Sequence, residues 1–217
     1  MFIGLLASQP LLALIWLIVI LMALTIHEFA HALIGLKLGD PTAESMGRVT
    51  LNPMAHIDWV GFLPLLLLGF GWAKPVPFNP YNLKDPKWDA VKIALAGPAS
   101  NFLLAIVSAL VFRGLTMAGV IGFNNALSFF LILLVIINLY LMFFNIVPIY
   151  PLDGSKLLDA LLVKPEHQRV RQSIAHYGPR VLMMLVILAL LTDFNIFFFI
   201  SVPSSFVCDL LIGQRCF

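Results

Sequence analysis

The sequence has few charged residues. Its 217 residues include 13 lysines and arginines and 11 aspartates and glutamates, together 11% of the chain, whereas soluble domains carry about a quarter. With 61% hydrophobic residues and a mean hydropathy of +0.99, the composition excludes an ordinary soluble domain and predicts an integral membrane protein. The net charge of +2 is too small to favour nucleic acid, so no nucleic-acid partner is expected.

Cysteine is also scarce. Cys208 and Cys216 both lie near the end of the sequence, and their spacing matches no metal-binding pattern. This excludes a cysteine-based metal site and a disulfide-rich fold, and leaves open whether the two residues pair. The first residues lack the basic stretch and the small-residue cleavage site of a signal peptide, so we expect them to belong to the mature chain.

What the chain does have is long apolar runs. Residues 60–72 are apolar but too short to cross a bilayer, and three prolines in residues 73–80 prevent a helix from continuing, so a re-entrant element is expected. Residues 42–58, with strand character at 49–51, predict a short extended or β-like segment near the membrane surface. Four other segments are each long and apolar enough to cross as a helix. They are residues 10–38, 88–117, 126–147 and 181–202.

The predicted fold class is therefore an all-α polytopic membrane protein, a helical bundle with about four full spans, one re-entrant element and a short β-like segment near the site. We expect a single integral-membrane domain over residues 1–217, with its core in residues 10–163. Most basic residues can lie on the cytosolic side if the re-entrant element enters and leaves by one face, which places the N-terminus outside. These residues are Lys37, Arg48, Lys74, Lys84, Lys87, Lys92, Lys156, Lys164, Arg169, Arg171 and Arg180.

Residues 25–31 read Thr-Ile-His-Glu-Phe-Ala-His and lie within the first predicted span. On a helix, His27 and His31 are one turn apart and project from the same face, so two imidazoles can bind one zinc ion. Glu28 lies on the adjacent flank, where a carboxylate can take a proton from zinc-activated water. The alternative is a pair of hydrogen-bonded core histidines, although polar residues at membrane depth are usually kept for a function.

A hydrolytic zinc site needs a third protein ligand. Residues 145–154 read Asn-Ile-Val-Pro-Ile-Tyr-Pro-Leu-Asp-Gly, and the two prolines end the third predicted span near the depth of the histidines. Asp153 is then a candidate ligand, and a helix N-cap is its alternative role. Asn101, inside the second span, is by itself best explained as a polar contact between packed helices.

Taken together, these motifs resemble the site-2 protease family of intramembrane zinc metalloproteases. The resemblance rests on His-Glu-x-x-His at residues 27–31 and on Asn-x-x-Pro-x-x-Pro-Leu-Asp-Gly at residues 145–154. Residues 71–77 and 97–101 are similar to the minimal bacterial branch of that family, which carries no PDZ or CBS domain. The means of substrate selection is therefore left open.

The resemblance implies an endopeptidase with one Zn²⁺ ion that cuts a transmembrane segment near the cytosolic face. Glu28 would be the general base, and Asn101 and Asn145 would hold the substrate or polarise the scissile carbonyl. The expected partners are a single-span membrane protein substrate and the lipid bilayer, and the expected location is the bacterial cell membrane. By matching position, the implied zinc ligands are His27, His31 and Asp153.

Other classes of membrane protein would show different sequence features. A metal transporter would carry polar residues along a path through several spans, whereas here they gather at one boundary. Glu28 disfavours a non-catalytic relative, and the run at 145–154 disfavours a protease of the prenyl-endopeptidase kind. A strand edge at residues 49–51 is expected to hold the extended substrate by strand addition. Three further histidines are interpreted as non-ligands, with the first of them expected nearest the site: His56, His167 and His176.

Overall fold

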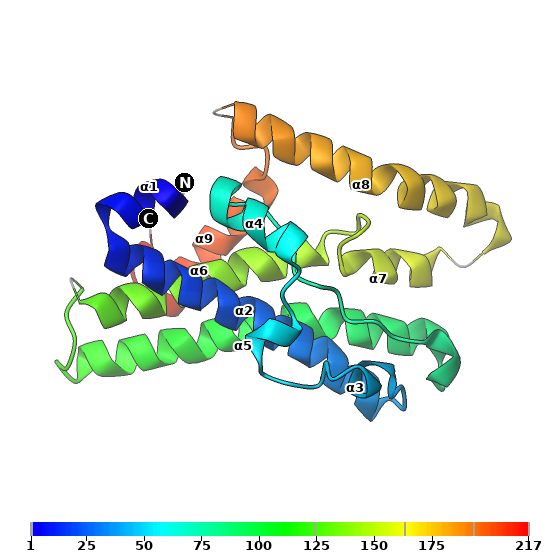
Figure 1. Ribbon diagram of the computed structural model, residues 1–217, viewed down its shortest axis with the longest axis horizontal. Helices are drawn as coiled ribbons and strands as arrows, with labels where there is room; N and C mark the ends of the chain where they lie inside the picture. Colours follow the sequence, from blue (N-terminus) through cyan, green and yellow to red (C-terminus); the bar gives the residue numbers. More distant parts are fainter. Residues whose placement is uncertain (1, 124, 163, 193, 217) are drawn as a thin grey trace.

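The structure is a computed structural model that describes residues 2–123, 125–162, 164–192 and 194–216. These residues form helices and connecting turns, with no β-strand among them (Figure 1). The longer helices are α1 (Phe2–Ser8), α2 (Pro10–Lys37), α4 (Trp59–Leu68), α5 (Pro86–Met117), α6 (Ala126–Ile146), α7 (Gly154–Leu161), α8 (Gln168–Leu191) and α9 (Phe198–Ile212). The short ones are α3 (Thr42–Ser45), η1 (Pro53–Ala55), η2 (Pro80–Asn82) and η3 (Pro165–His167).

Within the described residues, four helices are long and apolar enough to cross a membrane: α2, α5, α6 and α8. The shortest of them, α6, has 21 residues, and at about 1.5 Å per residue it measures roughly 31 Å, the thickness of a hydrocarbon core. The prediction of an all-helical integral membrane protein with four spans is confirmed. The first three predicted spans agree with α2, α5 and α6 to within two residues at each end.

The core of the bundle lies between α2, α5 and α6, which pack side by side, while α8 lies apart from them beyond α4 and α7 (Figure 1). Small side chains such as Ala105 and Ala109 let α5 approach α6, where Val135 and Leu139 are fully buried. Helix α9 packs on the same two helices and ends in the Cys208–Cys216 disulfide, close to the end of α5. The sequence left open whether Cys208 and Cys216 pair, and in the structure they do.

The C-terminal part differs from the predicted span at residues 181–202. Helix α8 begins thirteen residues earlier, at Gln168, and ends at Leu191, and α9 begins only at Phe198. Asn195 lies in the break, while Asp193, the other predicted interruption, lies outside the described residues. The ring of Phe197 packs edge-on against Phe144 at 6.1 Å, so α9 starts beside the end of α6. The polar and basic residues 168–180 form the first half of α8 with most of their side chains exposed.

The predicted β-like segment is not confirmed, because residues 42–58 form turns and short helices. Asp40 accepts hydrogen bonds from the backbone N–H and the hydroxyl of Thr42, which starts α3, and Asn52 caps η1. Such local side-chain to backbone bonds compete with strand pairing and prevail here. Asp40 is fully buried and also accepts from Asn79 and Asn82, so it ties the end of α2 to the loop before α5.

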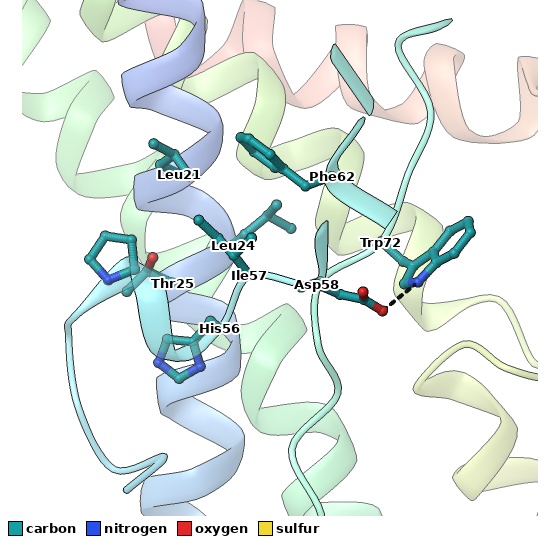
Figure 2. Close-up of a pocket in the computed structure, with 10 residues that line it drawn as sticks. Leu21, Leu24, Thr25, His56, Ile57, Asp58, Phe62 and Trp72 are labelled. Carbon is teal, nitrogen blue, oxygen red and sulfur yellow. Dashed lines mark hydrogen bonds between the residues drawn. The ribbon is translucent and has the colours of Figure 1, made fainter. Parts of the chain in front are cut away.

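Residues 56–74 form a hairpin, called here the α4 hairpin. Helix α4 has ten residues and ends at Gly69 with a φ of 80°, and the chain then returns so that the Lys74 N–H donates to the His56 carbonyl at 2.8 Å. Asp58 caps α4 and accepts from the indole N–H of Trp72 at 3.0 Å, a bond that closes the hairpin across a small cavity (Figure 2). The two ends of the α4 hairpin, at residues 56 and 74, therefore lie next to each other.

Candidate metal centre

The two motif histidines lie on α2, the helix formed by the first apolar run. His27 and His31 are one turn apart and both are buried, and their Nε2 atoms are 3.0 Å from each other. The edge-on arrangement of the rings, with centroids 4.6 Å apart, directs both Nε2 atoms to one point. Helical periodicity alone accounts for this pairing.

Asp153 reaches the same point from the chain that follows α6. Its Oδ2 atom lies 3.1 Å from Nε2 of His27 and 3.3 Å from Nε2 of His31. Asp153 occupies the N-cap position of α7, yet its side chain makes no capping hydrogen bond to the described residues of that helix. Gly154 makes the approach possible, since a Cβ there would lie 2.1 Å from the Ile146 carbonyl oxygen. The carboxylate thus faces the imidazoles rather than the helix end.

Among the described residues, His27, His31 and Asp153 form a group that could hold a metal ion. Their facing atoms make a triangle with sides of 3.0, 3.1 and 3.3 Å. Zinc bound tetrahedrally at about 2.0–2.1 Å places its ligand atoms roughly 3.3 Å apart. The donor set and its spacing therefore fit zinc with one position left for water or substrate.

Helix α5 contacts both imidazoles at Nδ1, the ring nitrogen that does not face Asp153. Nδ1 of His31 lies 2.7 Å from the Ile93 carbonyl, and Nδ1 of His27 lies 2.5 Å from the side-chain oxygen of Asn101. Because a carbonyl oxygen can only accept, each Nδ1 carries the proton and each Nε2 keeps its lone pair for a metal. Gly97 leaves the room between them: a Cβ there would lie 2.4 Å from Nε2 of His31.

Glu28 lies beside the cluster on the same helix and is buried. Its Oε2 atom accepts a hydrogen bond from the backbone N–H of Val76 at 3.1 Å. The chain just before Val76 is fixed by the buried Arg48, whose guanidinium donates to the carbonyls of Lys74, at 2.5 Å, and Pro75, at 3.3 Å. Glu28 is therefore held at the edge of the site by an extended segment that Arg48 keeps in place.

Two cavities meet at the cluster. The larger, of about 580 Å³, lies between α2, α6, the end of the α4 hairpin and α8, and it reaches His27, Glu28 and Asp153. The smaller, of about 220 Å³, lies on the side of the extended segment and reaches Glu28, His31 and Asp153. The larger cavity is lined mainly by apolar side chains, which suits a hydrophobic peptide segment.

The two asparagines take different places. Asn145 is half-buried, lines the larger cavity with Glu28 and Asp153, and donates one hydrogen bond to the Leu141 carbonyl at 3.0 Å. Asn101 is 0% exposed, its side-chain oxygen contacts His27, and it lines neither cavity. The structure thus makes Asn101 a partner of a metal-facing imidazole, and its expected role toward the substrate stays a prediction.

The remaining histidines lie away from the cluster. His56 contacts the Thr50 carbonyl at 2.8 Å and Arg48 at 3.4 Å. It borders the small cavity between α2 and the α4 hairpin, which Thr25 also lines (Figure 2). His176 contacts Arg180, and His167 lies near Glu166. Three contributors to the site were not predicted from the sequence: Arg48, Gly97 as a steric necessity, and Asn138, which bonds to Asn101. Gly97 stands in a run of small residues and begins the 97–101 motif that resembles the family, and these were its visible signals.

Comparison with known proteins points the same way. The sequence profile of peptidase family M50 matches residues 112–189. Two relatives bear names that begin "Putative zinc metalloprotease": YwhC of Bacillus subtilis is 35% identical over 173 residues, covering 78% of each chain, and Rip2 of Mycolicibacterium smegmatis is 28% identical, covering 77% of this chain and 64% of Rip2. Zinc metalloprotease MJ0392 of Methanocaldococcus jannaschii is 23% identical, covering 81% of this chain and 42% of MJ0392. No solved structure matches the chain.

A bundle of four membrane-spanning helices with a His-His-Asp cluster, its two histidines buried, and an adjacent glutamate defines an integral membrane metalloenzyme. The chain belongs to peptidase family M50, the site-2 protease family, whose members act on membrane protein substrates within a bilayer. It is a zinc metalloprotease.

Proposed function

We propose that the chain is an intramembrane endopeptidase that cuts a transmembrane segment of a single-span membrane protein near the cytosolic face of a bacterial cell membrane. The observation that carries this proposal is the convergence of His27, His31 and Asp153 on one point, with Glu28 beside them and a cavity in front. Residues 1–217 would act as a single membrane domain.

In this proposal, His27, His31 and Asp153 hold the zinc ion. Each imidazole offers a bare Nε2 because its Nδ1 proton is committed to an oxygen on α5, and Asp153 adds negative charge. When bound, zinc supplies Lewis acidity, which makes water nucleophilic near neutral pH and polarises a peptide carbonyl.

Glu28 is the proposed general base. The Val76 N–H occupies its Oε2 atom, which leaves Oε1 to accept the proton of the attacking water and to return it to the leaving amine. Asn145 is the proposed oxyanion donor, since one N–H of its amide is taken by Leu141 and the other is available to the cavity.

The larger cavity is the proposed substrate site. A peptide bond inside a helix is enclosed by its own hydrogen-bond ladder, so the substrate must be unwound before cleavage. Residues 70–73 line the cavity without regular secondary structure. The backbone groups of this segment that Gly61, His56 and Arg48 do not engage can pair with an extended strand. The apolar walls then receive the side chains of the membrane segment.

The proposed topology has the N-terminus outside and the zinc near the cytosolic boundary. Two observations support it. The ends of the α4 hairpin meet at the bond between Lys74 and His56, which suits an element that enters and leaves by one face. The Cys208–Cys216 disulfide lies near the Arg113 end of α5, the end that this topology places outside, where oxidising conditions preserve disulfides.

The deciding experiment is cleavage by the purified protein in lipid vesicles, using a panel of single-span substrates. We expect cleavage inside the spanning segment that stops with a zinc chelator and returns with added zinc. Glu28→Gln is the matched control, because it leaves the three zinc ligands in place and removes the proton acceptor. Cleavage that persists at the wild-type rate in this variant, or in the presence of the chelator, would overturn the proposal.

A further inference from the structure

We propose that Asn138 is a positioning residue for the metal centre. Its side chain sets the orientation of the Asn101 amide, and Asn101 in turn sets which nitrogen of His27 is free to bind zinc. This inference rests on the proposed function, because it requires His27 to be a zinc ligand. Asn138 itself contacts neither the cavities nor the cluster.

A chain of hydrogen bonds links the three residues across three helices. Asn138 on α6 donates to the Leu134 carbonyl of its own helix at 2.7 Å. Its side-chain oxygen accepts from the Asn101 amide nitrogen on α5, also at 2.7 Å, and Asn101 contacts His27 on α2 at 2.5 Å. Asn101 and Asn138 are both 0% exposed, so water cannot replace either partner.

Each bond in the chain determines the direction of the next. The Leu134 carbonyl can only accept, so it takes the amide N–H of Asn138 and turns the Asn138 oxygen toward α5. That oxygen and the Ala23 carbonyl, at 3.3 Å, are both acceptors. The amide nitrogen of Asn101 must therefore face them and donate to both. The Asn101 oxygen is then left facing Nδ1 of His27, which must carry the proton.

The reverse orientation of Asn101 would disable the site. An amide N–H facing Nδ1 would require a lone pair there and move the proton to Nε2, the atom that faces His31 and Asp153. A protonated Nε2 cannot bind zinc. Without Asn138, only the longer contact to Ala23 opposes this reversal. Outer hydrogen-bond partners of this kind typically change metal affinity by about 10–100-fold when they are mutated.

A simple packing role for the two asparagines makes a different prediction. If Asn138 only holds α6 against α5, its loss lowers stability, and its effects add to those of Asn101. If Asn138 acts through Asn101, removing it after Asn101 is gone changes metal binding no further. Non-additivity in metal affinity therefore separates positioning from packing.

The experiment is a double-mutant cycle on purified full-length protein with Zn²⁺ and Co²⁺ as probes. Affinity is measured by competition with a chromophoric chelator, and ligand geometry by the visible absorption of bound Co²⁺. We expect Asn101→Ala to lower affinity by about 10–100-fold and Asn138→Leu by about tenfold with an altered Co²⁺ spectrum. The double variant should bind no more weakly than Asn101→Ala alone. Asn138→Asp in its neutral form can donate its O–H to the Leu134 carbonyl and accept from Asn101, so it should restore affinity.

Controls keep the outcome decisive. Ser108→Ala removes a buried hydroxyl that bonds only within α5, and it should leave metal affinity unchanged. If Asn138→Leu does not fold, Asn138→Ala removes the same carbonyl without added bulk. Wild-type affinity and spectrum in Asn138→Leu or Asn138→Ala, or additive losses in the double variant, would overturn the inference. Failure of the proposed function is distinguished by His27→Ala, which would then retain zinc.

Discussion

Replacing Asp153 by asparagine separates the two roles that its sequence position allows. Asparagine caps a helix as well as aspartate does but brings no negative charge to a metal. In the structure, the Asp153 side chain makes no capping hydrogen bond to the described part of α7, so a substitution there removes no cap. A change in stability of well under 1 kcal/mol is therefore expected from any effect on the helix.

The effect on zinc is expected to be much larger. Four-ligand structural zinc sites bind with apparent free energies of about 10–16 kcal/mol, or roughly 2.5–4 kcal/mol for each ligand. Asp153 is one of three protein ligands proposed here, and its oxygen lies 3.1 and 3.3 Å from the two imidazole nitrogens. Loss of this ligand should weaken zinc binding by about 10²–10³-fold. Cleavage should fall to background.

The assay is zinc content after dialysis against a chelator of known affinity, with thermal unfolding measured on the same samples. Asp85 supplies the matched control, because it does cap α5, accepting from the N–H groups of Lys87 and Trp88 at 3.1 Å. Asp85→Ala should lower stability by about 1 kcal/mol and keep zinc. Asp153→Asn should do the reverse. Full zinc occupancy in Asp153→Asn at the wild-type affinity would refute the assignment of the third ligand.

Four further expectations follow from the same structure. Asn145→Ala should lower the catalytic rate by about 10²–10³-fold with zinc content unchanged, as is typical for a lost oxyanion donor; an unchanged rate would remove it from catalysis. Gly97→Ala should stabilise an isolated helix by about 1 kcal/mol, yet abolish zinc binding because its Cβ collides with the imidazoles; zinc retention would contradict the described packing. Burial acts to raise the pKa of Asp40, but the hydrogen bonds that it accepts outweigh burial and lower it. Its stabilisation should thus be complete above pH about 4 and fade as the pH falls further. The difference in thermal unfolding between the wild type and Asp40→Asn, on the order of 3 kcal/mol at pH 7, should therefore shrink as the pH is lowered below about 4. A reporter fused after Lys87 should read cytosolic and one after Gly122 external, whereas an external Lys87 reporter would mean that the α4 hairpin crosses the membrane.

Much of the metal centre could be predicted because it depends on local rules. The spacing of His27 and His31 fixes their common face once α2 is helical, and the prolines before Asp153 end α6 at the right depth. The role of Asn101 could not be predicted in this way. It depends on the rotation of α5 about its own axis, and α5 is apolar around most of its circumference, so the pattern of residues does not reveal which side faces α2.

The parts of the fold that were predicted less well share a different cause. At residues 42–58, side-chain caps from Asp40 and Asn52 decide the local structure, and the strand-like composition at 49–51 has no partner strand among the described residues. At the C-terminus, the polar first half of α8 is helical while exposed, so hydrophobicity alone placed the start of the helix too late. Both errors arise where burial does not determine the structure.

The metal centre has unequal sides, and this has a consequence for how such an enzyme can diversify. The α5 side, with Ile93, Gly97 and Asn101, touches both imidazoles through fixed bonds or a gap too small for one methyl group. On the cavity side, α8 and residues 70–75 join α2 and α6 in forming the wall, and neither of these two segments supplies a metal-facing atom. Substitutions that alter which peptides fit can therefore accumulate on one wall while the chemistry on the other is preserved. A library that varies Leu182 and Met183 should yield altered substrate preferences at constant zinc affinity.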